Sequence, residues 1–363
     1  MKKKILILAN NDVGLYQFRK ELIEDILKIN EVVISLPYGE LVDQLKEMGC
    51  QFIDTTVDRR GINPITDLKL YFGYRRLLKT ERPDLVITYT IKPNVYGGYA
   101  CRKLGIPYAI NITGLGTAFQ NDGILKKIVT TMYKVACKKA KVVFFENEEN
   151  RQIFIKEKIA KEEQTHRLNG AGVNLDKYQV LNYPQGDKVK FLFIGRIMAE
   201  KGINELFTAM KMLVSEGVNC ELDVLGGYEE NYKEIIDKYE KEGWLKYYGY
   251  QNDVKPFIEY CHCFVLPSWH EGMANTNLES AASGRAIITC NIHGCLEAVD
   301  DGVTGFLCEK KNADDLYKVM KEFIKLSYEE RKAMGLAGRK RMEKNFDKRK
   351  VVEETMNCLK IIQ

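Results

Sequence analysis

The stretch that decides the fold is FLFIGRIMAEKGINELFTAM, residues 191–210. It opens with a short apolar run, turns at a glycine, and continues into residues with the spacing of an amphipathic helix. An apolar run of this length, with no polar residues alternating in it, predicts a strand that is buried on both faces. A strand, a loop and a helix in this order are the repeating unit of a parallel sheet with helical crossovers.

The same alternation continues through the whole chain, which at 363 residues is too long for one compact core and suits two domains. Short runs rich in β-branched and aromatic residues predict strands in both halves. The predicted strands are 4–9, 31–36, 50–55, 84–89, 108–113 and 141–146, then 189–195, 220–226, 245–250, 263–268, 285–290 and 304–309. We therefore predict an α/β protein with two Rossmann-like, doubly wound parallel-sheet domains that face a central cleft.

The predicted division of the chain follows from where the alternation is interrupted. The first domain is placed at 1–170, a turn-rich linker at 171–188, and the second domain at 189–343. The remaining segment, 344–363, is amphipathic and is expected to form a helix that packs back on the first domain.

The composition bears on where the protein works. No apolar run reaches the roughly 20 residues that span a bilayer. The start, MKKKILILANN, has a basic flank, but its apolar part covers only Ile5 to Ala9, so we interpret it as a buried strand and not a signal peptide. The ten cysteines are scattered, without metal or redox spacing. A reduced, cytoplasmic protein is expected.

The net charge of +5 is unevenly distributed along the chain. Residues 1–180 carry 29 Lys and Arg against 21 Asp and Glu, whereas residues 181–363 carry 26 against 29. The basic excess gathers in LYFGYRRLLK (70–79) and KKIVTTMYKVACKKAK (126–141). These segments predict either helices that rest on an anionic membrane surface or ordinary surface helices with one buried face. The excess is too small and too localised to indicate nucleic-acid binding.

The first predicted strand is followed by NNDVGLYQFRKEL. Gly14 permits a tight backbone turn, and a helix that starts near Tyr16 would present free N–H groups to a ligand. No second or third glycine follows at the spacing of a dinucleotide fingerprint, so a nicotinamide cofactor is disfavoured. A plain loop between strand and helix is the alternative interpretation.

The second half carries cations in the loop after its first strand. Gly195 and Arg196 end that strand, and Lys201 follows five residues later, just before a helix. Two cations beside a helix N-terminus are suited to neutralise a diphosphate. The alternative is that both cations are solvated loop charges.

Two further stretches of the second half are suited to a nucleotide. DVLGGYEE ends the next strand with Gly226 and Gly227, where the backbone is able to approach a ligand closely. YYGYQNDVKPFIEYC supplies a turn with aromatic residues, among them Tyr250, and is a candidate seat for a flat base.

HEGMANTNLE contains two acids, Glu271 and Glu279, with seven residues between them. On one continuous helix the two carboxylates would point about 80° apart, a poor arrangement for a catalytic pair. We predict instead a loop that turns near Gly272 and a helix that starts around Asn275 or Thr276, both good N-cap residues. The free N–H groups of that helix would then lie between the two acids.

Taken in order, "GR…EKG", "GG", "YGYQNDV", "LPSWHEGMANTNLES" and "DGVTGFL" resemble the donor domain of retaining GT-B glycosyltransferases. The most similar group is the family numbered four, which builds bacterial capsule, O-antigen and glycan-lipid chains. The segment 89–119 is similar to the acceptor half of the capsule branch of that family.

The resemblance implies a role for each matching residue in the second half. Glu271 is expected to contact the donor hexose, and Glu279 the ribose hydroxyls. Arg196 and Lys201 are expected to clamp the diphosphate. The residues expected to meet the sugar and the distal phosphate between the two acids are Gly272, Met273, Ala274, Asn275 and Thr276.

In the first half the resemblance implies an acceptor and phosphate region. We place in it Gly14, Tyr16, Arg19, Lys92, Asn94 and Thr113. The chain departs from the family pattern twice, because many relatives have histidine where Thr113 stands and proline where Ala274 stands.

The resemblance also implies an activity. It is transfer, with retention, of a hexose or N-acetylhexosamine from a nucleotide-sugar, expected to be a UDP-sugar, to a polyprenyl-diphosphate-linked saccharide. Such an enzyme would work in the cytoplasm, peripherally associated with the inner face of the plasma membrane. No cofactor or metal is expected, because no Asp-x-Asp occurs and the four histidines show no ligand spacing. We interpret His270, beside Glu271, as a packing residue of the loop.

Two other functions fit the same architecture. A UDP-sugar epimerase needs acid and base groups around the hexose but no acceptor. A non-catalytic nucleotide-sugar-binding protein needs neither, and the complete set of Arg196, Lys201, Glu271 and Glu279 argues against it.

Overall fold

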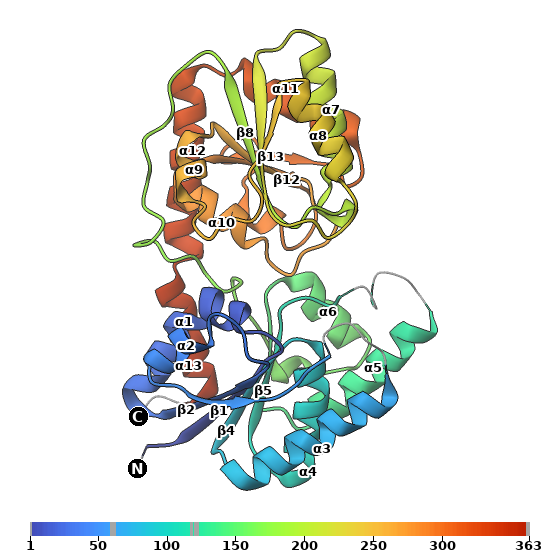
Figure 1. Cartoon of the computed structure of the whole chain (residues 1–363). Helices are drawn as coiled ribbons and strands as arrows, with labels where there is room; N and C mark the ends of the chain where they lie inside the picture. The colour runs from blue at the N-terminus through green and yellow to red at the C-terminus, as the bar shows by residue number, and fades with distance from the viewer. Residues whose placement is uncertain (1, 59–62, 117–118, 120–122, 361–363) are drawn as a thin grey trace. The chain divides into compact units, whose positions relative to one another are not determined.

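The computed structural model describes residues 2–58, 63–116, 119 and 123–360 (Figure 1). It divides the chain into two compact units, one made of Met1–Ala171 with Lys348–Gln363 and the other of Gly172–Asp347. Among the described helices, none combines the length and the apolar character that a membrane crossing requires.

The first unit is built on one parallel sheet with the strand order β3-β2-β1-β4-β5-β6-β7. From β1 the chain adds strands in one direction, and from β4 it adds them in the other, so the topological switch point lies between β1 and β4. The strands are β1 (Lys4–Leu8), β2 (Glu31–Leu36), β3 (Gln51–Asp54), β4 (Leu85–Tyr89), β5 (Tyr108–Ile112), β6 (Val142–Phe145) and β7 (Thr165–Arg167).

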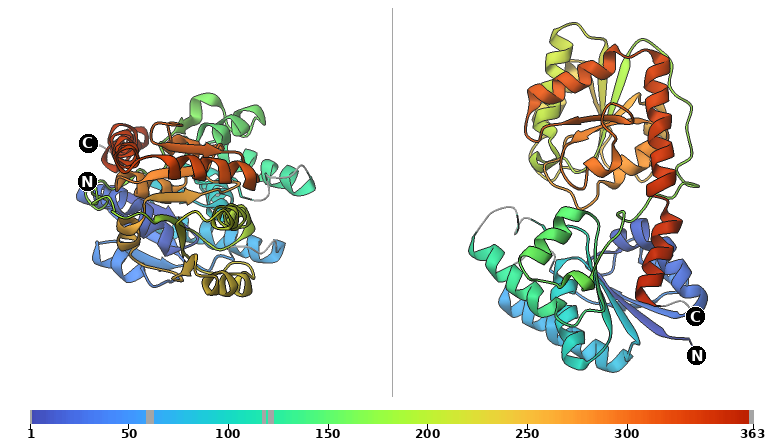
Figure 2. Two further views of the ribbon diagram at one scale, coloured as in Figure 1. Left: turned by 90° about the horizontal axis from the view of Figure 1, so that it is seen from above. Right: turned by 180° about the vertical axis from the view of Figure 1, so that it is seen from behind.

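Helices cover both faces of this sheet (Figures 1 and 2). Along β1, Ile5 and Ile7 pack under α1, α2 and α13, whereas Leu6 and Leu8 face α3, α4 and α5. The helices are α1 (Asp12–Ile29), α2 (Val42–Glu47), α3 (Pro64–Glu81), the π-helix η1 (Pro93–Gly97), α4 (Gly98–Leu104), α5 (Ile124–Cys137), α6 (Glu148–Lys156), the short η3 (Glu162–Gln164) and α13 (Lys348–Leu359).

The second unit repeats this plan with the strand order β10-β9-β8-β11-β12-β13, also parallel throughout. Its switch point lies between β8 and β11. Its strands and helices share a single hydrophobic core. The strands are β8 (Val189–Ile194), β9 (Cys220–Leu225), β10 (Leu245–Tyr247), β11 (Cys263–Leu266), β12 (Ala286–Cys290) and β13 (Gly305–Cys308). The helices are η4 (Ala199–Lys201), α7 (Ile203–Ser215), α8 (Lys233–Lys241), α9 (Lys255–Tyr260), α10 (Asn275–Ala282), η5 (Leu296–Ala298), α11 (Ala313–Lys325) and α12 (Tyr328–Asn345).

These strands confirm the fold class that the sequence predicts. Each of the predicted apolar runs contains a strand, which is at most three residues shorter than predicted. The structure adds β7, Thr165–Arg167, which the sequence does not reveal because Thr-His-Arg carries no apolar signal. Parallel pairing with β6 at the edge of the sheet, and not burial, holds this strand in place.

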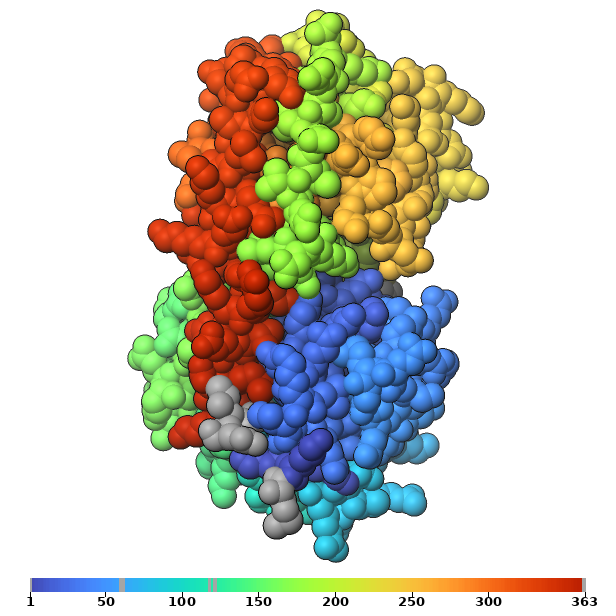
Figure 3. Space-filling view, turned by 90° about the vertical axis from the view of Figure 1, so that its left-hand side faces the viewer, coloured from blue at the N-terminus to red at the C-terminus, as the bar shows by residue number. Residues whose placement is uncertain are grey.

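The segment 172–188, which reads as a linker in the sequence, is part of the second unit. Arg339 donates to the carbonyl oxygen of Tyr178 at 2.6 Å, and the buried Arg285 donates to that of Asn182 at 2.6 Å. Figure 3 shows this green segment on the surface beside the red α12. Two arginines thus hold the segment along its length.

The C-terminal helix α13 belongs to the first unit, although it follows the second in sequence. Lys348 forms an ion pair with Glu21 of α1 at 3.3 Å, and Glu354 accepts a hydrogen bond from His166 at 2.7 Å. Residues 361–363 of the predicted terminal helix lie outside the described residues.

The loop after β9 depends on a glycine that makes room for the backbone of its neighbour. Gly226 has φ +138, and a Cβ atom there would lie 1.8 Å from the carbonyl oxygen of Gly195. At Gly227 the same addition meets no heavy atom within 4 Å among the described residues. Gly226 therefore serves close packing of the β8 and β9 ends, and the predicted approach of a ligand to this loop stays a prediction.

We expect Gly226→Ala to lower the free energy of unfolding of the second unit by more than about 1 kcal/mol, because both the clash and the positive φ must be relieved. Gly227→Ala is the matched control and should change it by less than about 0.5 kcal/mol. Urea unfolding followed by tryptophan fluorescence measures this unit selectively, since both tryptophans, Trp244 and Trp269, lie in it. Equal midpoints and slopes for the two variants would contradict this account of Gly226.

Candidate active site

The loops that follow β8 and β11 pack against each other at the switch point of the second unit. Gly202 has φ +73, and a Cβ atom there would lie 2.0 Å from the carbonyl oxygen of Pro267. The carbonyl oxygen of Glu200 accepts hydrogen bonds from the amide of Trp269 at 2.9 Å and from the hydroxyl of Ser268 at 3.2 Å. Because the backbones of the two loops are in contact, a side chain from one loop is able to contact a side chain from the other.

Those side chains are Lys201 and Glu271. Lys201 Nζ lies 2.5 Å from Glu271 Oε1, and the two side chains are 17% and 12% exposed. The sequence predicts both residues for one site, and the structure brings them together across 70 positions of chain. The lysine charge is therefore held by a carboxylate, and an anionic ligand that reaches Lys201 must either share this ion pair or open it.

The helix after Glu271 is α10, which starts at Asn275 as the sequence predicts. The predicted side-chain cap is wrong, because Ala274 is the N-cap residue and no side chain caps the helix. The amide of Ala274 donates instead to the carbonyl oxygen of Gly294 at 2.7 Å, so a neighbouring loop sets where the helix begins. It also removes the Ala274 N–H from the groups available to a ligand.

The first two residues inside α10, Asn275 and Thr276, retain amides that the helix itself does not use. Such amides, with the helix dipole behind them, favour an anion at this end of α10. Met273 is buried in the loop just before the helix. Glu279 lies one turn farther along the helix and is half-buried, as predicted.

The other donor-site residues lie in more open positions. Arg196 is 3.5 Å from Glu229 and its side chain is 55% exposed, so this ion pair is weakly held and leaves the arginine accessible to solvent. Gly195 is half-buried, and its amide bonds to the carbonyl oxygen of Leu225 at 3.0 Å. Tyr250, predicted as part of a seat for a base, is 63% exposed.

Three buried polar atoms in residues close to Glu271 along the chain have no hydrogen-bond partner among the described residues. They are Nε1 of Trp269, Nε2 of His270 and Oδ1 of Asn275. Native proteins rarely leave buried polar atoms unpaired, so three of them in one loop segment are typical of a site that a polar ligand or water completes. The interpretation of His270 as a mere packing residue stays a prediction.

A buried thiol lies close to the same pair. Burial, with the negative charge of Glu271 as a smaller contribution, raises the pKa of Cys295 well above its ordinary value. The thiol therefore stays protonated at neutral pH, and it is fully buried. A neutral, inaccessible thiol is not a nucleophile.

In the first unit, the structure corrects the prediction for Gly14. Helix α1 begins at Asp12 and not near Tyr16, and Asn11 is its N-cap. The Asn11 side chain accepts from the amide of Gly14 at 2.7 Å. Gly14 is therefore part of the first helical turn, with its N–H group in use. The half-buried Tyr16 lies within the same helix, with Lys20 Nζ 5.2 Å from the centre of its ring.

The predicted cations of the first unit are already paired. Arg19 forms a buried ion pair with Glu146 and lies 5.1 Å from the centre of the Tyr89 ring. Lys92 Nζ lies 2.7 Å from Asp67, and both side chains are largely buried. The sequence does not reveal either acid as a partner, because each is far away along the chain.

Asn94, whose predicted contact with the acceptor stays a prediction, makes two hydrogen bonds within the first unit. Its Oδ1 accepts from the hydroxyl of Thr88 at 2.7 Å and its Nδ2 donates to the carbonyl oxygen of Asn111 at 2.8 Å. Thr113 follows β5 and is half-buried, at the carboxyl edge of the sheet. Thr90 at the same edge has φ +72, a backbone strain that is typical of functional sites.

The sequence interpretation passes over the loop that supports Glu271. Gly294 has φ +90, and a Cβ atom there would lie 2.5 Å from the carbonyl oxygen of Glu271. Glu297, three residues later, accepts a hydrogen bond from the amide of Gly294 at 2.7 Å. The sequence signal for this supporting loop is a glycine soon after a buried strand, followed three residues later by an acid that is able to accept a hydrogen bond from its amide.

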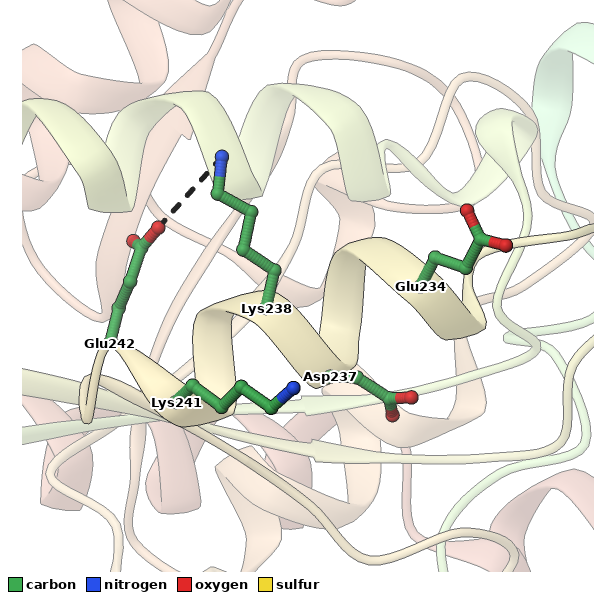
Figure 4. A pocket seen from close by; sticks show the side chains of 5 residues that line it. All are labelled: Glu234, Asp237, Lys238, Lys241 and Glu242. Atoms are coloured by element: carbon green, nitrogen blue, oxygen red, sulfur yellow. Dashed lines mark ion pairs between the residues drawn. The ribbon is translucent and has the colours of Figure 1, made fainter.

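A hollow of about 470 Å³ lies elsewhere on the second unit, along α8 (Figure 4). All five side chains that line it are charged. Four belong to α8 and the fifth, Glu242, follows its last residue and lies 4.0 Å from Lys238. It contains none of the predicted site residues. No group of three or more potential metal ligands occurs within the part of the chain that the structure describes.

Comparison with known proteins agrees with this fold. The chain matches the family model "Glycosyl transferase 4-like" over residues 4–147 and the model "Glycosyl transferases group 1" over residues 179–341. A similar solved structure is that of Anabaena Alr3699/HepE in complex with UDP-glucose, with a TM-score of 0.82 at 16% identity. The alignment covers 99% of this chain and all of that one.

Two similar proteins act on lipid-linked sugars according to their names. One is the N,N'-diacetylbacillosaminyl-diphospho-undecaprenol alpha-1,3-N-acetylgalactosaminyltransferase of Campylobacter jejuni, 27% identical over 86% of this chain and 87% of its own length. The other is the UDP-Gal:alpha-D-GlcNAc-diphosphoundecaprenol alpha-1,3-galactosyltransferase of Escherichia coli, 27% identical over 78% and 76%. With both of its units matched, the chain belongs to the glycosyltransferases, as a glycosyl transferase 4-like domain followed by a group 1 domain.

Proposed function

We propose that this glycosyltransferase moves a hexose or N-acetylhexosamine from a UDP-sugar to a polyprenyl-diphosphate-linked saccharide, in bacterial surface polysaccharide or glycan assembly. The observation that supports this most is the Lys201–Glu271 pair, which lies at the switch point of the second unit beside the first amides of α10. A cation, an acid and a helix N-terminus at one point are what a nucleotide diphospho-sugar requires.

The donor binds with its diphosphate between Lys201, Arg196 and the amides of Asn275 and Thr276. Glu271 then turns from the lysine to a hydroxyl of the sugar, and Glu279 receives the ribose hydroxyls. Charged hydrogen bonds of this kind each contribute roughly 1.5–3 kcal/mol. As the glycosidic bond breaks, negative charge grows on the departing diphosphate, and each donor aimed at it stabilises the transition state by about 2.7–4 kcal/mol.

The transfer proceeds with retention and without a covalent enzyme intermediate. The acceptor hydroxyl attacks the anomeric carbon on the face that the diphosphate leaves, and the departing phosphate oxygen takes the hydroxyl proton. The neutral, buried Cys295 offers no nucleophile beside the pair. Both relatives are named for alpha-1,3 linkages, so an α-configured donor would keep its configuration. No Asp-x-Asp occurs in the sequence, which supports a reaction without a divalent metal.

The lipid-linked acceptor and the UDP donor are inferred from relatives. The Campylobacter jejuni and Escherichia coli proteins are both named for acceptors on diphospho-undecaprenol, and the second is named for UDP-Gal. An acceptor of this kind is held in a bilayer, so the protein works in the cytoplasm at the inner face of the plasma membrane.

The first unit has a surface suited to an anionic membrane. On α3, Ile65, Leu68 and Phe72 form one stripe, and α5 adds Ile124 and Ile128, every one at least 50% exposed. These helices lie on the same side of the sheet as α4, which contacts both (Figure 1). No acid occurs from residue 124 to residue 141, which carry six lysines. Apolar side chains flanked by lysines are typical of surfaces that enter the headgroup region.

The ordinary-helix interpretation applies to the opposite face of α3. Leu70, Tyr74 and Leu78 from the predicted basic segment are buried in the core, whereas Phe72 and Arg76 point outward. The exposed apolar stripe that supports the proposed membrane contact therefore begins before the predicted basic segment, at Ile65.

Mass spectrometry of reactions with a panel of UDP-sugars, with and without a membrane extract as acceptor, tests the proposed activity. We expect one donor to yield UDP and a lipid lengthened by one sugar. A chelator of divalent metals should not lower the yield, and NMR of the product should show that the anomeric configuration is retained. Conversion of the donor without UDP would indicate an epimerase. Binding of a donor without any turnover would indicate a non-catalytic binder.

Glu271→Ala and Lys201→Ala should each lower turnover at least about tenfold at saturating donor. Lys201→Ala loses a donor that stabilises the departing diphosphate by ~2.7–4 kcal/mol, and Glu271→Ala loses a charged hydrogen bond to the sugar worth ~1.5–3 kcal/mol. Lys238→Ala, on the hollow along α8, is the matched control and should leave turnover unchanged. Circular dichroism confirms that each variant is folded. Near wild-type turnover in a folded variant removes that residue from its proposed role.

Replacing Phe72 or Ile128 with Glu should weaken binding to vesicles that contain phosphatidylglycerol by at least about tenfold, since burial of one such side chain contributes ~1.5–3 kcal/mol. Val303→Glu, an exposed apolar residue of the second unit, is the control. Co-sedimentation at rising salt measures the effect, and binding should weaken as salt screens the lysines. Equal binding to vesicles of phosphatidylcholine alone would contradict an anionic partner.

A further inference from the structure

Both carboxylate oxygens of Glu297 make contacts within the turn that packs against the loop carrying Glu271. The residue belongs to the short helix η5 after β12, and its side chain is 13% exposed. Its Oε2 accepts from the amide of Gly294 at 2.7 Å, and its Oε1 lies 2.9 Å from His293 Nδ1. One carboxylate therefore fixes two successive residues of the turn.

Gly294 transmits that constraint to the loop that carries the acid. Its carbonyl oxygen accepts from the amide of Ala274 at 2.7 Å, which sets the start of α10. Its Cα hydrogen faces the backbone of Glu271, since an added Cβ atom would lie 2.5 Å from the Glu271 carbonyl oxygen and 2.9 Å from the Glu271 Cβ. The glycine thus touches the acid residue and the helix cap at once.

The other side of Glu297 is anchored to a long helix. Arg341 of α12 donates to the carbonyl oxygen of Glu297 through Nε at 3.1 Å and Nη2 at 2.9 Å. Its Nη1 donates to Asp300 at 2.6 Å. A continuous series of hydrogen bonds therefore leads from α12 through Glu297 and Gly294 to the cap of α10, with Glu271 in contact with the glycine.

We propose that Glu297 is a positioning residue for sugar transfer, which acts by holding Glu271 in register with the bound donor. This inference rests on the proposed role of Glu271. The loop that carries Glu271 leads into α10, and no side chain caps that helix. The hydrogen bond from the Ala274 amide to the Gly294 carbonyl oxygen therefore holds the end of this loop. A misplacement of about 1 Å at a reacting centre costs roughly a hundredfold in rate.

A role confined to folding makes a different forecast. If Glu297 served only the stability of its turn, its loss would lower the unfolding midpoint and would reduce donor turnover whether or not Glu271 is present. A positioning role acts through Glu271, so its effect disappears once that carboxylate is gone. The two roles are separated by a double-mutant cycle.

The cycle compares kcat/KM for the UDP-sugar identified in the panel in four proteins: wild type, Glu297→Ala, Glu271→Ala and the double variant. We expect Glu297→Ala to lower kcat/KM on the order of tenfold to a hundredfold in the wild-type background. In the Glu271→Ala background we expect less than about a twofold change. Glu297→Gln keeps an oxygen for the Gly294 amide, and should retain activity within about threefold of the wild type.

His293→Ala is the matched control, because it removes one partner of Glu297 and leaves the Gly294 contact in place. Its kcat/KM should stay within about threefold of the wild type. Equal losses from Glu297→Ala in both backgrounds, or no loss in either, overturn the proposal. If Glu297→Ala does not fold, Glu297→Asp replaces it, since it keeps the charge but withdraws the carboxylate by one methylene group; wild-type kcat/KM there also overturns it.

The single variants separate this inference from the proposed function. Unchanged kcat/KM in Glu271→Ala contradicts the proposed donor contact itself. A loss in Glu271→Ala with no loss in Glu297→Ala contradicts only the positioning role.

Discussion

The contact between two backbones, Gly202 on the β8 loop and the Pro267 carbonyl on the β11 loop, is the constraint on which the donor site depends. Parallel strands on either side of a switch point have their following loops turned apart by the helices that cover opposite faces. Only where a glycine removes the intervening Cβ atom do the loops meet closely enough to share an ion pair. The pairing of Lys201 with Glu271 is therefore a consequence of backbone packing, and not of attraction between two solvated side chains.

Three glycines in the loops of the second unit each make room for a carbonyl oxygen of a neighbouring loop. Gly226 admits the carbonyl oxygen of Gly195, Gly202 admits that of Pro267, and Gly294 admits that of Glu271. In each case a carbonyl oxygen occupies the place of a side chain, with the glycine at positive φ. At these three points the loops at the carboxyl edge of the sheet are thus packed by main-chain atoms.

The sequence alone predicts the fold class and the strands well, because short runs such as ILIL in β1 and LVI in β4 are apolar without interruption and rich in β-branched residues. It also brings Lys201 and Glu271 to one site, through motif order. It fails for Gly14, where an asparagine three residues earlier caps the helix and places the glycine inside it. It does not reveal the ion pairs of Arg19 and Lys92, whose acids Glu146 and Asp67 are brought near only by the tertiary fold. Local patterns contain no information about such distant partners.

The first unit is discontinuous in sequence, and this affects how the protein is made. Val351, Val352, Met356 and Leu359 of α13 complete the core beneath α1 and one face of the sheet. During synthesis from the N-terminus, the part of this face that α13 covers stays open while the whole second unit emerges from the ribosome and folds. The core of the first unit is therefore closed only after the second unit has been made, once α13 has been synthesised.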